Sequence, residues 1–342
     1  MLEQNVSPSL SAQTGTNRRL HSASAPPIAV PTLLDEAWRL APFVHPFTFS
    51  AFFSPEDTLL CVCAADAAHG LLGAPSPRIT ELTSGSGLVG FYLLGRDVGA
   101  RLLGLDIDVE AAHVAAGNAR LLGVSDRARF VQSDLWSAST QKLLETDPPQ
   151  LLVCNPPYVP EPPGTHMEIE AGAGPHGTAH LLRALELARC VQPDALALSW
   201  CSLSDPAGIV DAAERAGYSL HELYVTAIAD GEYSGSVHSY LRTLDDCHIN
   251  EQRQTLNIIA PDGSARFAYL LFAGAFGRGR GDGSAAATVR TICETFARDG
   301  VSTLANIDAQ FPLHGSMLTR LDELGLRVML HGEISPPARG SA

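Results

Sequence analysis

The sequence predicts an α/β fold in which helices cover both faces of a mostly parallel sheet. Between residues 78 and 276, short apolar runs alternate with segments of helical periodicity. This alternation is typical of parallel strands joined by crossover helices. The seven predicted strands are residues 79–82, 102–105, 129–131, 151–154, 195–200, 220–228 and 265–273.

Residues that start and stop helices divide the chain between these runs. A serine, a proline and two acids at 54–57 predict the start of a helix that extends to about residue 72. Aspartate, glycine and proline signals, together with apolar periodicity, predict the remaining helices. These helices cover about 108–123, 178–192, 204–217, 285–298 and 315–323.

Four regions are expected along the 342 residues. Residues 1–32 are rich in Ser, Thr and Pro and lack the apolar segment of a secretory signal, which predicts a flexible tail. Residues 33–73 predict a helical cap, and residues 74–276 the core. Within the core, residues 229–264 interrupt the alternation of apolar runs and helical segments, which predicts a lid-like excursion. After the core, residues 284–342 predict a C-terminal α/β segment.

Charge and cysteine content disfavour several classes of protein. The chain has 23 Lys and Arg against 37 Asp and Glu, and its net charge of -14 disfavours binding to nucleic acid. The seven cysteines are scattered, with only Cys61 and Cys63 close together, so neither a disulfide framework nor a metal site is expected. No apolar run approaches the roughly 18 residues of a membrane span. We therefore expect a soluble, cytoplasmic protein without a membrane partner.

Polar residues at three strand ends indicate a nucleoside-binding site. The first strand leads into the turn Glu-Leu-Thr-Ser-Gly-Ser-Gly at 81–87, which opens a helix and whose small residues allow a ligand to approach the backbone closely. Asp106 ends the second strand, where a carboxylate can meet ribose hydroxyls. Asp134 ends the third strand, where it can accept the amino protons of an adenine. A nicotinamide-dependent dehydrogenase fits these features as well.

The tetrad Asn155-Pro156-Pro157-Tyr158 follows the fourth apolar run. Consecutive prolines fix φ and remove two N–H groups, which stiffens the segment. The side-chain oxygen of Asn155 and the carbonyl of Pro156 then offer two acceptors for the NH2 group of a planar nitrogen, and Tyr158 can stack on that group. An isolated tetrad is better interpreted as a strand-ending turn with a packed tyrosine. Its place after the glycine turn and two aspartates favours catalysis.

The glycine turn, Asp106, Asp134 and the tetrad, in this order, resemble class I S-adenosylmethionine-dependent methyltransferases. They resemble most the Asn-Pro-Pro-Tyr branch, which includes the HemK-like release-factor glutamine methyltransferases and the adenine amino-methyltransferases. Further similarities are SPEDTLL before the core, GNARLLG around Asn118 and the later AGAGPHGTAHLLRAL. The resemblance covers about residues 53–225 and implies a Rossmann-like fold with a seven-stranded sheet, S-adenosyl-L-methionine as cofactor and N-methylation as activity.

The chain also departs from this family at three places. Thr83 stands where the family has a glycine, and Glu81 stands where it has an aspartate. The helical N-terminal domain of the release-factor enzymes is missing or reduced to about residues 31–73.

The strand-end positions and the resemblance together predict the site residues. The expected catalytic residues are Asn155, Pro156 and Tyr158. The expected cofactor contacts are Glu81, Thr83, Gly85, Gly87, Asp106, Ile107, Asp134, Leu135 and Asn155. The expected substrate contacts are Phe53, Asn155, Tyr158, Glu161, Glu168 and Glu170.

The residues after the tetrad favour a particular methyl acceptor. Glu161, Glu168 and Glu170 follow it with no Lys or Arg before Arg183, so carboxylates that face the site would attract a planar cation. Solvated loop acids are an equally good interpretation. The favoured acceptor is a small guanidino or amide metabolite such as free arginine. The alternatives are a glutamine of a release factor and a scaffold that binds the cofactor without turnover.

Overall fold

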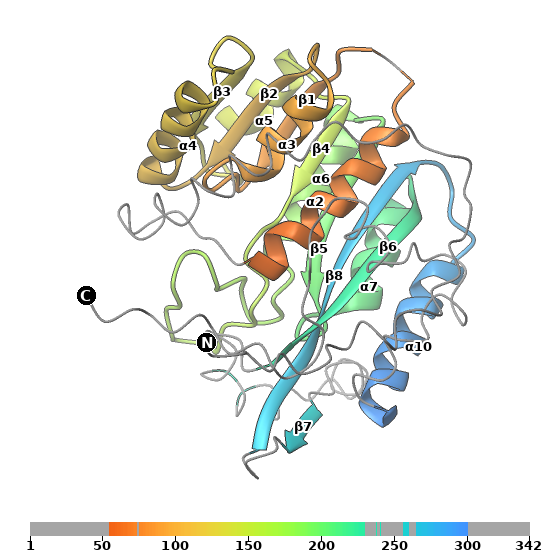
Figure 1. Cartoon of the computed structure of the whole chain (residues 1–342). Coiled ribbons are helices and arrows are strands. Elements are labelled where there is room, and N and C mark those ends of the chain that lie inside the picture. The colour runs from red at the N-terminus through yellow and green to blue at the C-terminus, as the bar shows by residue number, and fades with distance from the viewer. Residues whose placement is uncertain are drawn as a thin grey trace, which may run out of the picture.

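The computed structural model describes residues 55–73, 75–229, 237, 240, 256–259 and 265–299 (Figure 1). The helices are α2 (Pro55–Gly70), α3 (Leu88–Arg96), α4 (Val109–Leu121), α5 (Ala138–Thr146), α6 (Ala179–Val191), α7 (Pro206–Arg215) and α10 (Ser284–Asp299). The strands are β1 (Arg78–Leu82), β2 (Arg101–Asp106), β3 (Ala128–Gln132), β4 (Leu151–Cys154), β5 (Ala195–Cys201), β6 (Tyr218–Ala229), β7 (Leu256–Ile259) and β8 (Ala265–Arg278).

The strands form one sheet in the order β3-β2-β1-β4-β5-β8-β6, and β7 pairs with β8 beside this path. Strands β1 to β5 are parallel, whereas β8 runs antiparallel between β5 and β6. The chain reverses its direction of winding between β1 and β4, which makes their carboxyl ends the switch point where ligands bind in open α/β sheets. The predicted Rossmann-like fold of the class I methyltransferases is confirmed.

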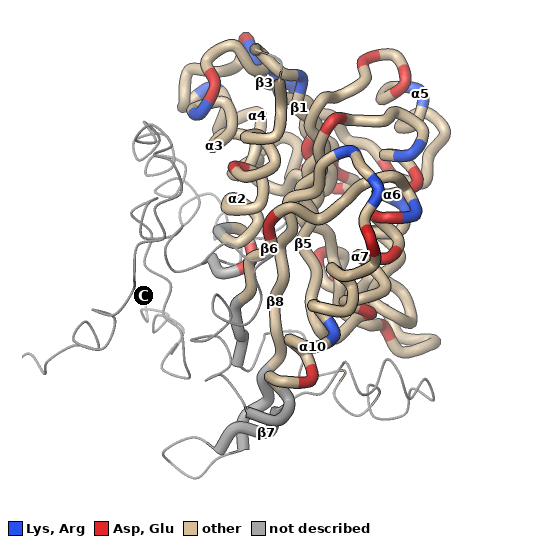
Figure 2. The backbone as a smooth tube through the Cα atoms, turned by 90° about the vertical axis from the view of Figure 1, so that its right-hand side faces the viewer, with Lys and Arg blue, Asp and Glu red and all other residues tan. Residues whose placement is uncertain are grey.

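The sheet separates two apolar cores. In β4, Leu151 and Val153 pack into one core, and Leu152 and Cys154 pack into the other. The first core also takes residues from α2, α3 and α4, and the second from α5, α6, α7 and α10. Figure 2 shows α2 and α3 on one side of the sheet and α5, α6 and α7 on the other. Burial on both faces explains why the strands are continuous apolar runs in the sequence.

Two predicted helix starts follow from capping residues that the structure confirms. Asp108 accepts a hydrogen bond from the Glu110 N–H at the start of α4, and Asp205 accepts one from the Gly208 N–H at the start of α7, both at 2.9 Å. Gly217 follows α7 with a φ of 95°, the left-handed conformation that ends helices.

Two elements were not predicted. Helix α5 buries only Thr140 and Leu144, which is too little apolar periodicity to mark a helix. Strand β7 lies within the excursion expected at residues 229–264, where the structure otherwise describes only Ala229, Val237 and Tyr240.

Several predicted regions lie outside the described residues. They are the tail at 1–32, the part of the cap before residue 55, most of the excursion, and residues 300–342 with their predicted helix and strand. Among the described residues, none of the helices has the length and apolar character required to cross a membrane. Across those same residues, no three His, Cys, Asp or Glu side chains are grouped so that they could hold a metal ion.

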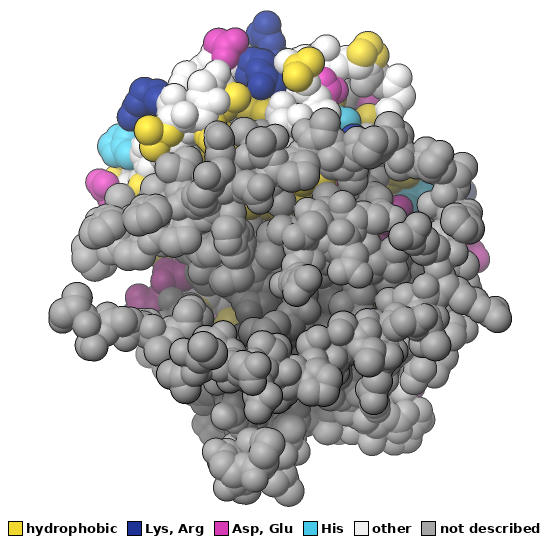
Figure 3. Space-filling model, viewed as in Figure 1, with side chains coloured by type: hydrophobic (Ala, Val, Ile, Leu, Met, Phe, Trp, Pro, Cys, Tyr) yellow, Lys and Arg dark blue, Asp and Glu magenta, His cyan; other side chains and the backbone are white. Residues whose placement is uncertain are grey.

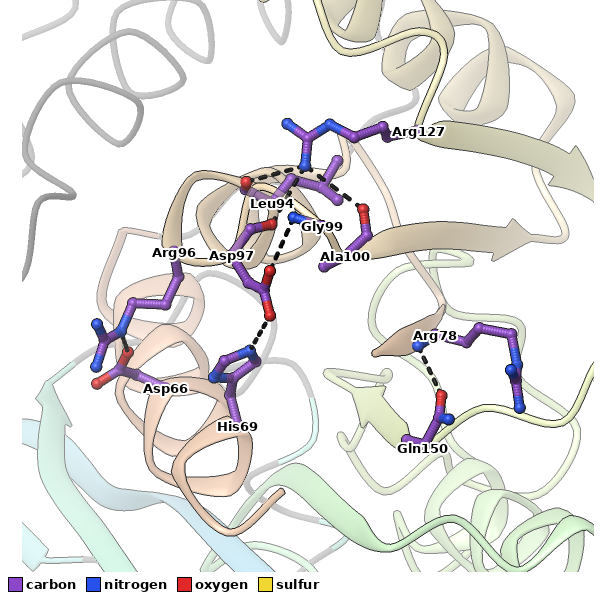
Figure 4. Close-up of polar contacts among 10 residues, drawn as sticks. All are labelled: Asp66, His69, Arg78, Leu94, Arg96, Asp97, Gly99, Ala100, Arg127 and Gln150. Atoms are coloured by element: carbon purple, nitrogen blue, oxygen red, sulfur yellow. Dashed lines mark hydrogen bonds and ion pairs between the residues drawn. The ribbon is translucent and has the colours of Figure 1, made fainter. Parts of the chain in front are cut away.

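Helix α2 is joined to α3 by a partly buried ion pair (Figure 4). Nε of Arg96 lies 2.8 Å from Oδ1 of Asp66, whose side chain is buried. Arg127 lies at the same, C-terminal end of α3, where its Nη1 donates to three backbone carbonyls. These carbonyls belong to Leu94, Asp97 and Ala100, at 3.2 to 3.4 Å. Helices α2 and α3 therefore form a rigid layer against the sheet.

Candidate cofactor and acceptor site

The glycine turn between β1 and α3 contains three residues in the left-handed conformation. Thr83, Gly85 and Gly87 have φ values of 52°, 51° and 81°. A Cβ on Gly87 would lie 2.8 Å from the ring of Phe130, so this position requires glycine. Thr83, which replaces a family glycine, adopts the conformation that glycine favours. The threonine at position 83 therefore leaves the backbone conformation of the turn as a glycine would have it.

Asp106 connects the end of β2 to the glycine turn. Its Oδ2 accepts a hydrogen bond from the Gly85 N–H at 2.8 Å, and its Oδ1 accepts one from the Asp108 N–H at 2.9 Å. Burial raises the pKa of Asp106, although these hydrogen bonds oppose the shift. Each carboxylate oxygen has two lone pairs, so acceptor capacity remains for a ligand.

Glu81 lies beneath the turn and is buried. Its Oε2 accepts a hydrogen bond from the Gly90 N–H at 3.0 Å, which satisfies one of the open donors in the first turn of α3. Burial raises the pKa of Glu81 to about 8, and the nearby carboxylate of Asp106 adds to the shift. A positive charge bound at the turn would favour the ionised form of Glu81.

Asn118 fastens α4 to the same turn, which gives the GNARLLG segment a structural role. Its buried Nδ2 donates to the carbonyl of Ser86 at 3.1 Å.

The segment after β3 presents both exposed and buried side chains. Asp134 is exposed, and its Oδ1 accepts from the Trp136 N–H at 2.9 Å. Leu135 is buried, while Ile107, at the end of β2, is 46% exposed. Trp136, whose role the sequence leaves open between core and adenine wall, is 51% exposed and so does not belong to the core.

Two residues of α6 support this segment, and sequence reasoning missed both in this role. Nε of Arg183 donates to the carbonyl of Leu135 at 2.9 Å. The ring of His180 meets that of Trp136 edge to face, with centroids 4.9 Å apart, and burial lowers its pKa. His180 and Arg183 lie three residues apart on one helix, a spacing that carries no functional signal without the fold.

Asn155 lies directly beside the glycine turn. Leu82 and Cys154 are paired in the parallel register of β1 and β4, so the residues that follow them, Thr83 and Asn155, leave the sheet side by side at the switch point. Oδ1 of Asn155 is buried and has no hydrogen-bond partner among the described residues. An unpaired buried acceptor costs about 1–3 kcal/mol, and in native proteins such groups indicate a function or a ligand. Pro156, the next residue, is buried as well.

Tyr158 is largely buried, with 8% of its surface exposed. Its hydroxyl donates to Oδ2 of Asp57 in the first turn of α2. Its predicted role as a stacking surface for the acceptor stays a prediction. The sequence assigned Asp57 only to the start of a helix, and its burial and its contact with Tyr158 were missed. The available signal was its spacing, because Asp57 lies three and four residues before the buried Leu60 and Cys61.

The three glutamates after the tetrad differ in their surroundings. Oε1 of Glu161 accepts from the Met167 N–H at 3.0 Å, so Glu161 braces its own loop. Glu168 is exposed, Glu170 is half-buried, and Phe53 lies outside the described residues. Their predicted contact with a substrate stays a prediction.

Similarities to solved structures are loose. The chain resembles the SAM-dependent methyltransferase of Agrobacterium tumefaciens with a TM-score of 0.39 and 15% identity, over 66% of this chain and 63% of that one. It resembles the Mtq2–Trm112 complex of E. cuniculi with a TM-score of 0.35 and 17% identity, over 66% and 98%. TM-scores of this size carry no information on function. No protein-family model matches the chain.

Sequence similarity to curated proteins is local but clear. The chain is 43% identical over 109 residues to the release factor glutamine methyltransferase of Chlorobaculum tepidum, which covers 31% of this chain and 37% of that protein. It is 40% identical over 95 residues to that of Rhodospirillum rubrum, over 28% and 27%. It is 30% identical over 92 residues to the tRNA1(Val) (adenine(37)-N6)-methyltransferase of Porphyromonas gingivalis, over 27% and 36%. The chain thus spans well under half the length of these relatives. Over that segment, the predicted similarity to release factor glutamine methyltransferases is confirmed.

Proposed function

We propose that the protein is an S-adenosyl-L-methionine-dependent N-methyltransferase. The observation that carries this proposal is the buried Oδ1 of Asn155 at the carboxyl end of β4, beside the glycine turn, which has no hydrogen-bond partner among the described residues. An acceptor oxygen in this position suits the NH2 group of a substrate. The local similarity to release factor glutamine methyltransferases supports the same conclusion.

The residues at the ends of β1, β2 and β3 fit the cofactor. The turn presents backbone without bulky side chains, Asp106 retains lone pairs, and the buried carboxyl of Glu81 suits a cationic group. When bound, S-adenosylmethionine supplies an electrophilic methyl group on a sulfonium. The residues proposed to hold it are Glu81, Thr83, Gly85, Gly87, Asp106, Ile107, Asp134, Leu135 and Asn155.

The tetrad is proposed to hold the nucleophile. The lone pair of an amide nitrogen is delocalised into its carbonyl, so the NH2 group reacts only when it is held and oriented. The side-chain oxygen of Asn155 and the carbonyl of Pro156 would accept its two hydrogens. Because both acceptors belong to a proline-stiffened segment, orientation of the nitrogen contributes much of the rate acceleration.

We infer that the methyl acceptor is a glutamine side chain in a protein. The relatives from Chlorobaculum tepidum and Rhodospirillum rubrum are named for that activity. The expectation of free arginine gains no support, since Glu161 is engaged within its loop and Glu168 is exposed. A nucleobase in RNA is disfavoured by the net charge of -14. On the described surface that Figure 3 shows, acidic, basic and apolar side chains are intermixed.

The experiment that tests the proposal supplies the protein with methyl-labelled S-adenosylmethionine and one acceptor at a time. The acceptors are a peptide chain release factor, free arginine and tRNA. We expect label on a glutamine of the release factor, located by mass spectrometry, and labelling about a hundredfold slower when Asn155→Ala replaces the wild type. Label on arginine or tRNA alone would overturn the inferred acceptor. Calorimetric binding of the cofactor without transfer to any acceptor would favour the scaffold alternative.

A further inference from the structure

A buried hydrogen bond joins helix α2 to the tetrad. The hydroxyl of Tyr158 donates to Oδ2 of Asp57, a residue 101 positions earlier in the chain. Asp57 is 3% exposed and Tyr158 is 8% exposed, so water contributes little to either side chain. A buried carboxylate is costly unless hydrogen bonds stabilise it, so this contact is not incidental to the fold.

The helix that carries Asp57 is firmly held. Helix α2 packs against β4, β5, β8 and α3. Asp66, two turns further along α2, is paired with Arg96 of α3 at 2.8 Å (Figure 4). Asp57 therefore presents its carboxylate to Tyr158 from a fixed position.

The segment after Tyr158 is also closed upon itself. The Val159 N–H donates to the carbonyl of Ala171 at 2.9 Å, and the Ala173 N–H donates back to the carbonyl of Val159 at 3.0 Å. The thiol of Cys201 in β5 lies 4.0 Å from the carbonyl of Tyr158. Tyr158 is thus the point where the tetrad and the following loop are attached to α2.

The surroundings of Tyr158 favour its protonated form, which can donate a hydrogen bond. Burial, and then the nearby charge of Asp57, raise the pKa of Tyr158 well above its usual value, with Tyr269 and Cys201 adding to the effect. The phenol therefore stays protonated near neutral pH, where it can donate to Asp57.

The side-chain oxygen of Asn155 has no hydrogen-bond partner among the described residues to fix its orientation. The backbone on either side must therefore orient this side chain. On one side, Cys154 is held in β4. On the other side, two prolines transmit the position of Tyr158 with little torsional freedom.

We propose that Asp57 is a positioning residue that, through Tyr158, fixes the orientation of Asn155 and of the Pro156 carbonyl for the methyl acceptor. This inference rests on the proposed N-methyltransferase function for its kinetic consequence. Its structural consequence, a loop after β4 that depends on Asp57, holds whether or not the protein transfers a methyl group.

The test compares three variants of the full chain with a matched control. Asp57→Ala removes the acceptor, Asp57→Asn keeps an acceptor oxygen for the phenol, and Tyr158→Phe removes only the donor. Asp66→Asn serves as control, because it weakens another buried acid of the same helix far from the tetrad. Each protein is measured for hydrogen exchange of residues 159–173, for cofactor affinity by calorimetry, and for kcat and KM.

We expect exchange of the amides of Val159, Ala171 and Ala173 to quicken by about tenfold or more in Asp57→Ala and in Tyr158→Phe. Cofactor affinity should change little, because Asn155 is only one of the nine residues proposed to hold the cofactor. The kcat should fall by between about tenfold and a hundredfold, and Asp57→Asn should recover most of the loss. A double variant that combines Asp57→Ala with Tyr158→Phe should be no slower than either single variant. Asp66→Asn should lower the melting temperature without altering loop exchange or kcat.

Unchanged loop exchange in Tyr158→Phe would overturn the proposal, as would multiplicative losses of kcat in the double variant. If the wild type methylates no acceptor, the proposed function fails and the exchange measurement alone decides the role of Asp57. If Asp57→Ala does not fold, Tyr158→Phe, which removes one oxygen atom, provides the same comparison.

Discussion

The backbone N–H of Gly85 donates to Oδ2 of Asp106 at 2.8 Å, which joins the glycine turn after β1 to the end of β2. Two elements of the proposed cofactor site are therefore bonded to each other. A carboxylate that is expected to meet a ribose also determines the shape of the turn that meets the rest of the ligand. Loss of this carboxylate should affect the fold and the binding of the cofactor together.

We expect Asp106→Ala to lower both the free energy of unfolding and the cofactor affinity, each by about 1–3 kcal/mol, because it removes two hydrogen bonds to a charged group. Asp106→Asn, which keeps one acceptor oxygen, should have a stability and a cofactor affinity between those of Asp106→Ala and the wild type. Chemical denaturation and calorimetry with S-adenosylmethionine measure the two effects. Unaltered affinity in folded Asp106→Ala would remove this residue from the cofactor site.

Two asparagines at the site should respond to substitution in opposite ways. Asn155→Ala removes a buried acceptor without a described partner, so stability should stay equal or rise by about 1 kcal/mol while kcat falls by about a hundredfold. Asn118→Ala leaves the carbonyl of Ser86 unpaired and should destabilise by about 1–3 kcal/mol. Thermal unfolding and turnover on the same preparations distinguish the two. A marked loss of stability in Asn155→Ala would mean that its side chain has a structural partner.

Two left-handed positions of the glycine turn should also differ. Thr83→Gly removes a side chain from a φ of 52° and should shift stability by no more than about 1 kcal/mol, since relief of strain and added chain entropy oppose each other. Gly87→Ala places a Cβ 2.8 Å from Phe130 and should destabilise by more than about 2 kcal/mol. Chemical denaturation of both variants measures the difference. Equal effects would mean that Thr83 is as tightly constrained as Gly87.

The sequence predicts the framework well because its signals are local. Strand β4 was predicted at its observed bounds, since a fully buried strand is a continuous apolar run. Asp108 and Asp205 predicted helix starts because a cap acts within its own turn. The order of the strands then brings the glycine turn, Asp106 and the tetrad to one edge of the sheet.

Contacts between distant residues could not be predicted from the same signals. The bond between Tyr158 and Asp57 spans 101 residues, and the bond between Arg183 and Leu135 spans 48. Glu161 offers a further example, because a carboxylate near a catalytic motif looks like a ligand until its partner within the loop is known. Helix α5, with two buried residues, carries too weak a pattern to be read at all.

The buried carboxyl of Glu81 should make stability depend on pH. Its pKa rises from an ordinary value of 4.5 to about 8 in the folded protein, mainly through burial. Between these two pH values the folded state binds a proton that the unfolded state has lost. The contribution of Glu81 to the free energy of unfolding is therefore fully present below about pH 4.5 and is lost as the pH rises to about 8. Asp106, whose pKa is also raised by burial, contributes with the same sign.

We expect Glu81→Gln to flatten this dependence, because glutamine can still accept from the Gly90 N–H but cannot ionise. The wild type should lose roughly 1 kcal/mol or more of unfolding free energy between about pH 5 and pH 8, and the variant distinctly less. Chemical denaturation of both proteins at the two pH values measures the difference. Parallel pH profiles for wild type and Glu81→Gln would show that Glu81 is ionised in the folded protein, in contact with a cation or with solvent.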